Sequence, residues 1–89
     1  MYLDTLTRHR RALHKIPELK YDLPRTQAYV LDALKGLNCE ITTAAEHGVL
    51  AYFDGGKSST VAFRSDMDAL PVAENTSHDY QSTIPGCMH

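Results

Sequence analysis

The sequence TVAFRSDMDALP, residues 60–71, joins a short apolar run to two aspartates. Residues 60–64 have the pattern of a β-strand, and Asp66 and Asp68 follow directly. Ligands of α/β proteins gather at the carboxyl ends of strands, so this position favours a functional site. Two carboxylates this close repel each other, and a divalent cation, a histidinium, Arg64 or a shared proton must offset the repulsion. A solvated loop with one aspartate capping a turn explains the spacing equally well.

Two helices are predicted on the amino-terminal side of this stretch. Leucine and isoleucine recur at helical spacing over residues 3–16, with basic residues between them, and Pro17 ends the pattern. A second helix is expected from Pro24, with Asp22 as its cap, because proline fits the first helical position. Its apolar face repeats as far as Leu37, where small and polar residues mark the end.

After the second helix the pattern changes to short apolar runs that are typical of strands. These runs cover residues 39–43, 48–53 and 60–64. The sequence DGGK, residues 54–57, is typical of a tight turn, so we expect the second and third runs to pair as a β-hairpin. Residues 65–89 show no sustained period and are predicted to form a loop. Two helices followed by a β-hairpin and strand indicate an α/β fold in which the helices cover one face of a sheet.

The composition excludes several classes of protein. A chain of 89 residues allows one domain at most. Its formal charge of −2 argues against nucleic acid or an anionic membrane as the partner. The absence of a signal-like run and of 18 consecutive uncharged apolar residues makes a cytoplasmic protein the expectation. Cys39 and Cys87 are too few for a disulfide framework, so we expect reduced thiols.

Histidines and the second cysteine are the remaining candidates for chemistry. Cys87 and His89 form a Cys-x-His pair, but zinc takes three or four ligands and no second pair stands at finger spacing. His14 is expected to pack at the end of the first helix and bond a backbone carbonyl, and His9 and His47 are expected at the surface or in a turn. Neither a Gly-x-Ser-x-Gly nucleophile motif nor a phosphate-binding glycine loop is present.

Four stretches in order along the chain carry a resemblance to a known family. These four motif blocks are Arg10-Arg11-Ala12-Leu13-His14 with Pro17-Glu18-Leu19, Gly48-Val49, Arg64 to Pro71 with Glu74 after it, and Pro85-Gly86-Cys87-Met88-His89. Together they resemble, nearly end to end, the amino-terminal part of the dinuclear metallopeptidase family of aminoacylases and glutamate carboxypeptidases. The likeness is to its amidohydrolase branch, which includes hippurate hydrolase, N-acetyldiaminopimelate deacetylase and indole-acetyl-amino-acid hydrolases.

The resemblance implies an enzyme that hydrolyses the amide bond of an N-acyl amino acid or a related small conjugate. It implies two divalent ions, zinc or manganese or else cobalt or nickel, that share an activated water. Residues 1–89 would then be the incomplete amino-terminal portion of a three-layer αβα zinc-peptidase-like catalytic domain, with no second domain in the chain. The longer enzyme would take a small-molecule substrate and could form a homodimer.

The resemblance also assigns roles to individual residues. Asp68 is the catalytic residue, since the corresponding aspartate in related branches orients a metal-binding imidazole. Asp66 stands where other branches place a histidine ligand, and with Arg64 and His89 it is expected to have a supporting role. The family's metal ligands and its general base come later in its sequence. No metal ligand is therefore expected within the chain, and Cys87 does not correspond to the family's ligand cysteine.

Two other interpretations remain open at this point. An apolar strand that ends in Asp-x-Asp is also the nucleophile and acid pair of haloacid-dehalogenase-like phosphotransferases, for which Asp66 and Asp68 would serve. Those enzymes begin near that strand and carry Thr or Val where Leu70 stands here, whereas two helices come first in this chain. The other interpretation is a non-catalytic, truncated domain, because the 89 residues lack the metal ligands and the base. We expect the isolated chain to bind no pair of metal ions and to be inactive.

Overall fold

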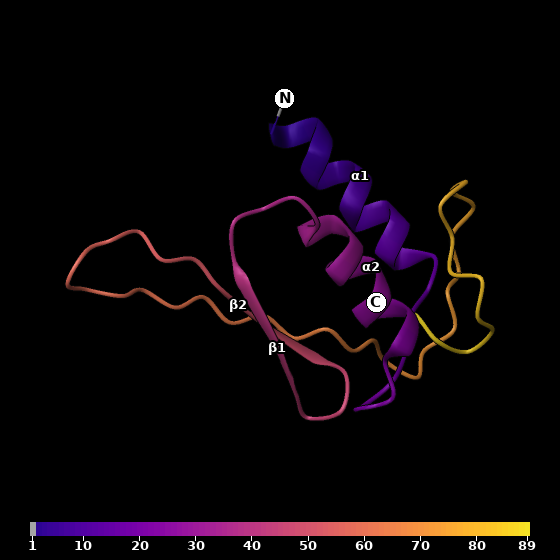
Figure 1. Ribbon diagram of the computed structural model, residues 1–89. Coiled ribbons are helices and arrows are strands. Elements are labelled where there is room, and N and C mark those ends of the chain that lie inside the picture. Colours follow the sequence, from indigo (N-terminus) through magenta and orange to yellow (C-terminus); the bar gives the residue numbers. More distant parts are fainter. Residues whose placement is uncertain (1) are drawn as a thin grey trace.

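The computed structural model describes residues 2–89 and has two helices followed by a β-hairpin (Figure 1). Helix α1 covers Tyr2–His14 and α2 covers Pro24–Leu34, and the strands are β1, Glu40–Ala44, and β2, Gly48–Tyr52. Helix α2 lies between α1 and the hairpin (Figure 1). The predicted α/β class, with two helices followed by a β-hairpin, is confirmed.

Helix α1 ends two residues earlier than its apolar pattern. Proline disfavours a helical backbone at the residue before it, and Pro17 limits the helix in this way. The amide of Ile16 still bonds the Leu13 carbonyl at 3.1 Å, which closes a final turn. Arg11 and His14 lie in the last helical turn, where positive charge suits the helix dipole. Pro17 itself is fully buried, so the end of α1 is fixed against the rest of the chain.

Helix α2 begins at Pro24 as predicted, but the predicted cap at Asp22 is wrong. Leu23 occupies the capping position and provides no side-chain hydrogen bond. The carboxylate of Glu18 accepts the amides of Arg25, at 3.1 Å, and Thr26, at 2.6 Å. First-turn amides need an external acceptor, and a carboxylate there also suits the helix dipole. Glu18, eight residues before Thr26, therefore caps α2.

The β-hairpin forms between different runs from those predicted. Strands β1 and β2 pair in antiparallel register from Glu40 with Tyr52 to Ala44 with Gly48. A Cβ atom on Gly48 would lie 2.5 Å from the Ala44 carbonyl oxygen, so the tight turn between the strands requires glycine here. The predicted pairing of residues 48–53 with 60–64 is wrong, because β2 pairs with the run that precedes it across a shorter turn.

Residues 53–65 extend away from the two helices as a long excursion (Figure 1). The turn predicted at residues 54–57 does form locally, since Asp54 Oδ1 accepts the Gly56 amide at 2.9 Å. The predicted strand over residues 60–64 is wrong, because no strand is present over residues 53–69. The Phe63 side chain is 95% exposed. The described part of the chain provides no surface that covers this apolar segment.

The small core lies where loop segments meet the two helices. Its buried residues are Pro17, Leu23, Thr26, Ala69 and Cys87. Both cysteines are free thiols, as expected. Within residues 2–89, no helix is long and apolar enough to cross a membrane.

Candidate functional site

The motif blocks that lie far apart in the sequence meet at one point of the structure. Leu70 and Met88 form an isolated antiparallel bridge, with amide-to-carbonyl distances of 2.9 and 3.0 Å in the two directions. Next to this bridge, the Ala69 amide donates to the Glu18 carbonyl at 2.7 Å. Backbone hydrogen bonds thus connect the first, third and fourth motif blocks. We call this meeting point of residues 17–18, 69–70 and 87–88 the junction.

Asp68 and His89 lie on either side of the junction. In an antiparallel bridge between Leu70 and Met88, His89 is placed opposite Ala69, one residue from Asp68. Burial lowers the pKa of His89, the charge of His14 lowers it further, and the charge of Asp68 raises it, with a net decrease. The lowered pKa favours a neutral imidazole at neutral pH.

The two aspartates of the Asp-x-Asp sequence have different environments. Asp66 Oδ1 lies 3.0 Å from Arg64 Nη2, and both side chains are largely exposed. Arg64 therefore offsets the charge of Asp66. The carboxylate of Asp68 is exposed and accepts no hydrogen bond from the residues that the structure describes. Of the two carboxylates, Asp68 is the one available to a further group.

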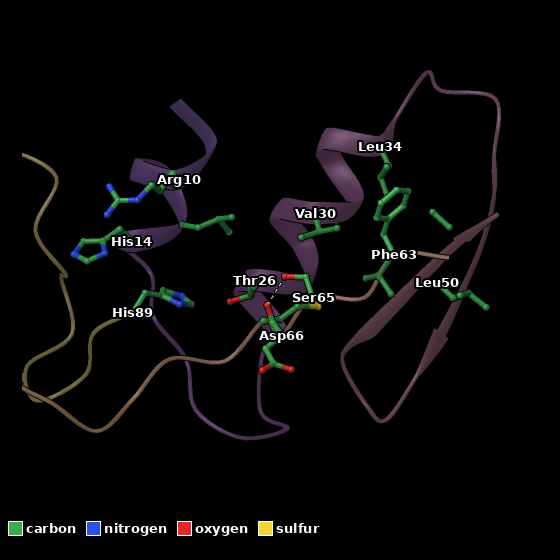
Figure 2. Close-up of a pocket in the computed structure, with 14 residues that line it drawn as sticks. Arg10, His14, Thr26, Val30, Leu34, Leu50, Phe63, Ser65, Asp66 and His89 are labelled. Carbon is green, nitrogen blue, oxygen red and sulfur yellow. Dashed lines mark hydrogen bonds between the residues drawn. The ribbon is translucent and has the colours of Figure 1, made fainter. Parts of the chain in front are cut away.

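A cavity of about 650 Å³ lies beside these residues (Figure 2). Figure 2 shows a polar end, formed by Arg10, His14 and His89, and an apolar end at the far side of α2. The apolar end is lined by Val30, Leu34, Val49, Leu50 and Phe63. Asp66 lies between the two ends (Figure 2). Basic and titratable side chains thus line one end of the cavity, and apolar side chains line the other end.

A second cavity, of about 590 Å³, includes Asp68 in its lining. Its other charged residues are Lys20, Arg64 and Asp66. Asp66, Ser65 and Met67 line both cavities, so residues 65–67 separate them. Asp68 and His89 consequently face different hollows on the two sides of this segment.

The sequence did not indicate the hydrogen bond between His14 and Glu74. His14 Nε2 lies 3.0 Å from Glu74 Oε1, so the predicted bond from His14 to a backbone carbonyl is wrong. The sequence singles out Glu74 only as the last residue of the third motif block. Its spacing from the other motif residues does not show that Glu74 contacts His14. His9 bonds the Tyr29 hydroxyl at 2.7 Å. His47 lies in the β1–β2 turn, as expected, with its Nδ1 2.9 Å from the Tyr21 carbonyl oxygen.

The residues described here do not fit a metal ion by themselves. No group of three or more histidine, cysteine or acidic side chains within residues 2–89 is arranged to hold one. The Cys87 side chain is buried as part of the core. Any metal site of a longer protein would need ligands from other residues, and no catalytic step through a metal follows from these side chains.

Comparison with known proteins finds relatives that are described as hydrolases. No family model matches the chain. Over 87 residues, 98% of the chain, it is 41% identical to an uncharacterized hydrolase of Staphylococcus aureus and 39% identical to one of Staphylococcus haemolyticus. The alignment spans 23% of each relative, so the chain has about a quarter of the length of these curated relatives.

Two solved structures share its fold. The Bacillus subtilis YXEP protein, a dinuclear metal-binding peptidase of the M20 family, matches 97% of this chain with a TM-score of 0.87 and 32% identity. The chain has the fold of part of an M20-family peptidase. A protein of methicillin-resistant Staphylococcus aureus assigned as an aminohydrolase matches 94% of the chain, with a TM-score of 0.85 and 33% identity. These alignments span 25% and 23% of the two solved chains.

Proposed function

We propose that this chain forms part of the catalytic domain of a metal-dependent hydrolase that cleaves the amide bond of an N-acyl amino acid or a similar small conjugate. The hydrolase relatives and the dinuclear metal-binding peptidase among the structural neighbours support the reaction class. The four motif blocks support the amidohydrolase branch and its substrate class. Two divalent ions, zinc or manganese or else cobalt or nickel, would be held by residues outside this chain.

The observation that carries the proposal is the position of Asp68 at the junction. The Leu70–Met88 bridge holds the backbone two residues beyond Asp68, and the Asp68 carboxylate has no hydrogen-bond partner among residues 2–89. A fixed carboxylate with a free oxygen accepts a hydrogen bond from an imidazole, sets its tautomer and raises its basicity. Asp68 is therefore assigned this positioning role. Arg64 neutralises Asp66, which limits the repulsion that a second carboxylate would exert.

The test uses a chimera in which this chain replaces the matching quarter of the YXEP protein. The chimera is assayed on N-acetyl and N-benzoyl amino acids with manganese or zinc, as purified and as Asp68→Asn. We expect Asp68→Asn to lower kcat by roughly 100-fold, as expected for loss of a group that positions a catalytic side chain. Asp22→Asn, which neutralises an exposed aspartate outside the junction, is the matched control and leaves kcat unchanged.

Two results would contradict different parts of the proposal. Full activity of the Asp68→Asn chimera would remove the role of Asp68 while leaving the reaction class intact. A folded, metal-loaded chimera that cleaves no N-acyl amino acid would reject the substrate class.

A further inference from the structure

The carboxylate of Glu74 is the centre of a hydrogen-bond network that the proposed reaction does not use directly. Only 7% of the Glu74 side chain and 11% of the His14 side chain are exposed. Glu74 Oε1 accepts the Ser82 amide at 2.7 Å and lies 3.0 Å from His14 Nε2. The Thr76 hydroxyl donates to Glu74 Oε2. The end of α1, the neighbouring Thr76 and Ser82 thus share one buried carboxylate.

Ser82 transmits this network to the carboxyl-terminal motif block. Its hydroxyl donates to the Cys87 carbonyl at 2.6 Å, and its oxygen accepts the Ile84 amide at 3.1 Å. Cys87 directly precedes Met88, whose backbone forms the bridge with Leu70. A continuous path of hydrogen bonds therefore runs from Glu74 through Ser82 to the residues that carry His89.

Helix α1 provides the fixed end of this path. His14 is the last residue of α1, and the carbonyl of the next residue, Lys15, accepts both the Thr83 amide at 3.1 Å and the Thr83 hydroxyl at 2.6 Å. Lys15 thus holds Thr83 directly, and His14 is linked to Ser82 through Glu74. A helix is a rigid support, whereas a loop without such bonds samples many conformations.

The charge of Glu74 is stabilised where it lies. The Ser82 amide and the Thr76 hydroxyl lower the pKa of Glu74, burial raises it, and His14 lowers it, with a net decrease. Glu74 is therefore ionised at neutral pH and accepts strong, charge-assisted hydrogen bonds. No other carboxylate belongs to this network, so repulsion does not weaken it.

We propose that Glu74 is a positioning residue, which holds residues 82–89 against α1 and so places the backbone of His89 opposite Ala69, the residue that follows Asp68. An effect of this placement on catalysis rests on the proposed function. The placement itself can be measured in this chain without any activity. Glu74 acts through Ser82 and the Cys87 carbonyl and does not touch the reacting groups. A merely local role of Glu74 in packing the loop would leave Met88 and His89 unaffected when Glu74 is replaced.

The first experiment measures backbone hydrogen exchange by NMR in the 89-residue chain. We expect Glu74→Ala to reduce protection of the Met88 and Leu70 amides by at least about tenfold while the β1–β2 hairpin amides keep theirs. Ser82→Ala should reproduce the effect, because it removes the donor to the Cys87 carbonyl. Glu46→Ala, at an exposed glutamate in the β1–β2 turn, is the matched control and should change neither set of amides.

Glu74→Gln separates positioning from a general loss of folding. Glutamine keeps one acceptor oxygen for the Ser82 amide, so it should restore most of the protection that Glu74→Ala removes. If Glu74→Ala unfolds the hairpin as well, Ser82→Ala and Glu74→Gln decide the question. Unchanged Met88 protection in Glu74→Ala or in Ser82→Ala would overturn the proposal.

The second experiment measures kinetics in the YXEP chimera. We expect Glu74→Ala to lower kcat by about 10-fold or more with a smaller change in KM, and Glu74→Gln to recover most of the loss. Unaltered kcat would overturn a positioning role in the reaction. A parent chimera without activity would reject the proposed function. The hydrogen-exchange result for Glu74 would still hold, because that experiment needs no substrate or metal.

Discussion

The junction and the excursion, residues 53–65, differ in how far their backbone is hydrogen-bonded to distant segments and in how far their side chains are buried. At the junction, backbone bonds of 2.7–3.0 Å connect residues as far apart in the sequence as Glu18 and Ala69. In the excursion, the bond from Gly56 to Asp54 is local, and Phe63 is 95% exposed (Figure 1). Thr26, a polar residue near the junction, is only 2% exposed. Burial in this chain is therefore concentrated where segments are hydrogen-bonded together, and an apolar side chain outside that region stays exposed.

An apolar pattern forms a strand only where another part of the protein offers a surface for it to pack against. Residues 60–63 have the composition of a strand, but the described part of the chain offers them no neighbouring strand. The junction segments contain fewer large apolar side chains, yet several hydrogen bonds fix them at once. We expect substitutions in these two regions to have very different effects on stability.

Leu23→Ala should have the largest effect on the free energy of unfolding. Leu23 is buried beside the start of α2, and its amide donates to His47 Nδ1 at 3.0 Å. Truncating a buried leucine removes apolar contacts and leaves a cavity, which costs about 2–5 kcal/mol. Urea unfolding followed by circular dichroism measures the change, with Leu3→Ala at an exposed leucine of α1 as the control. A loss under 1 kcal/mol would show that the core near the junction is loosely packed.

An intermediate effect is expected when acid protonates Glu18. Burial raises the pKa of Glu18, but hydrogen bonds from the Thr26 amide and hydroxyl and from the Arg25 amide, with the charge of Arg25, outweigh it and lower the pKa. A carboxyl group whose pKa is lowered by folding stabilises the fold above its unfolded value of 4.5, and this contribution disappears as the pH falls through the folded value.

The free energy of unfolding should therefore decrease as the pH falls below about 4.5. Glu18→Gln should have lower stability at neutral pH and a flatter dependence over the same interval. Urea titrations at several pH values compare the two proteins. Parallel curves for the wild type and Glu18→Gln would show that this carboxylate does not cap α2 in solution.

Phe63→Ser should have the smallest effect. The phenylalanine side chain is almost fully exposed, so its removal takes away no contact within the chain. We expect the free energy of unfolding to change by less than about 0.5 kcal/mol. Thermal unfolding measures the change, and sedimentation tests whether self-association decreases as an exposed aromatic group is lost. A loss above 1 kcal/mol would show that the excursion packs against the rest of the chain in solution.

Local features of the fold could be predicted from the sequence, because they depend on neighbouring residues. Proline limits the end of α1 and starts α2, and the apolar period shows which residues are helical. The choice of strand partners was predicted incorrectly, since two runs of similar composition competed for β2. Glycines at residues 55–56 favoured a hairpin there, and a local turn does form, but β2 pairs with β1 across the turn at residues 45–47.

The candidate site was predictable only in part. The Asp-x-Asp sequence and the resemblance drew attention to Asp68, Asp66, Arg64 and His89, and the structure shows that Arg64 pairs with Asp66. The roles assigned to these residues remain predictions. Glu74 was visible only as a member of a motif block. Its partners lie 8 and 60 residues away, and sequence spacing does not carry information about such contacts.

By itself, the sequence determined the helices, the apolar runs and the chemical types available near Asp68, because these follow from propensities and from short-range spacing. Only the tertiary structure decided that Glu18 caps α2, that Leu70 meets Met88, and that Glu74 joins α1 to residues 82–89. Each of these contacts closes a loop of the chain. Its formation depends on whether several hydrogen bonds together offset the entropy of closure, which no single stretch of sequence specifies.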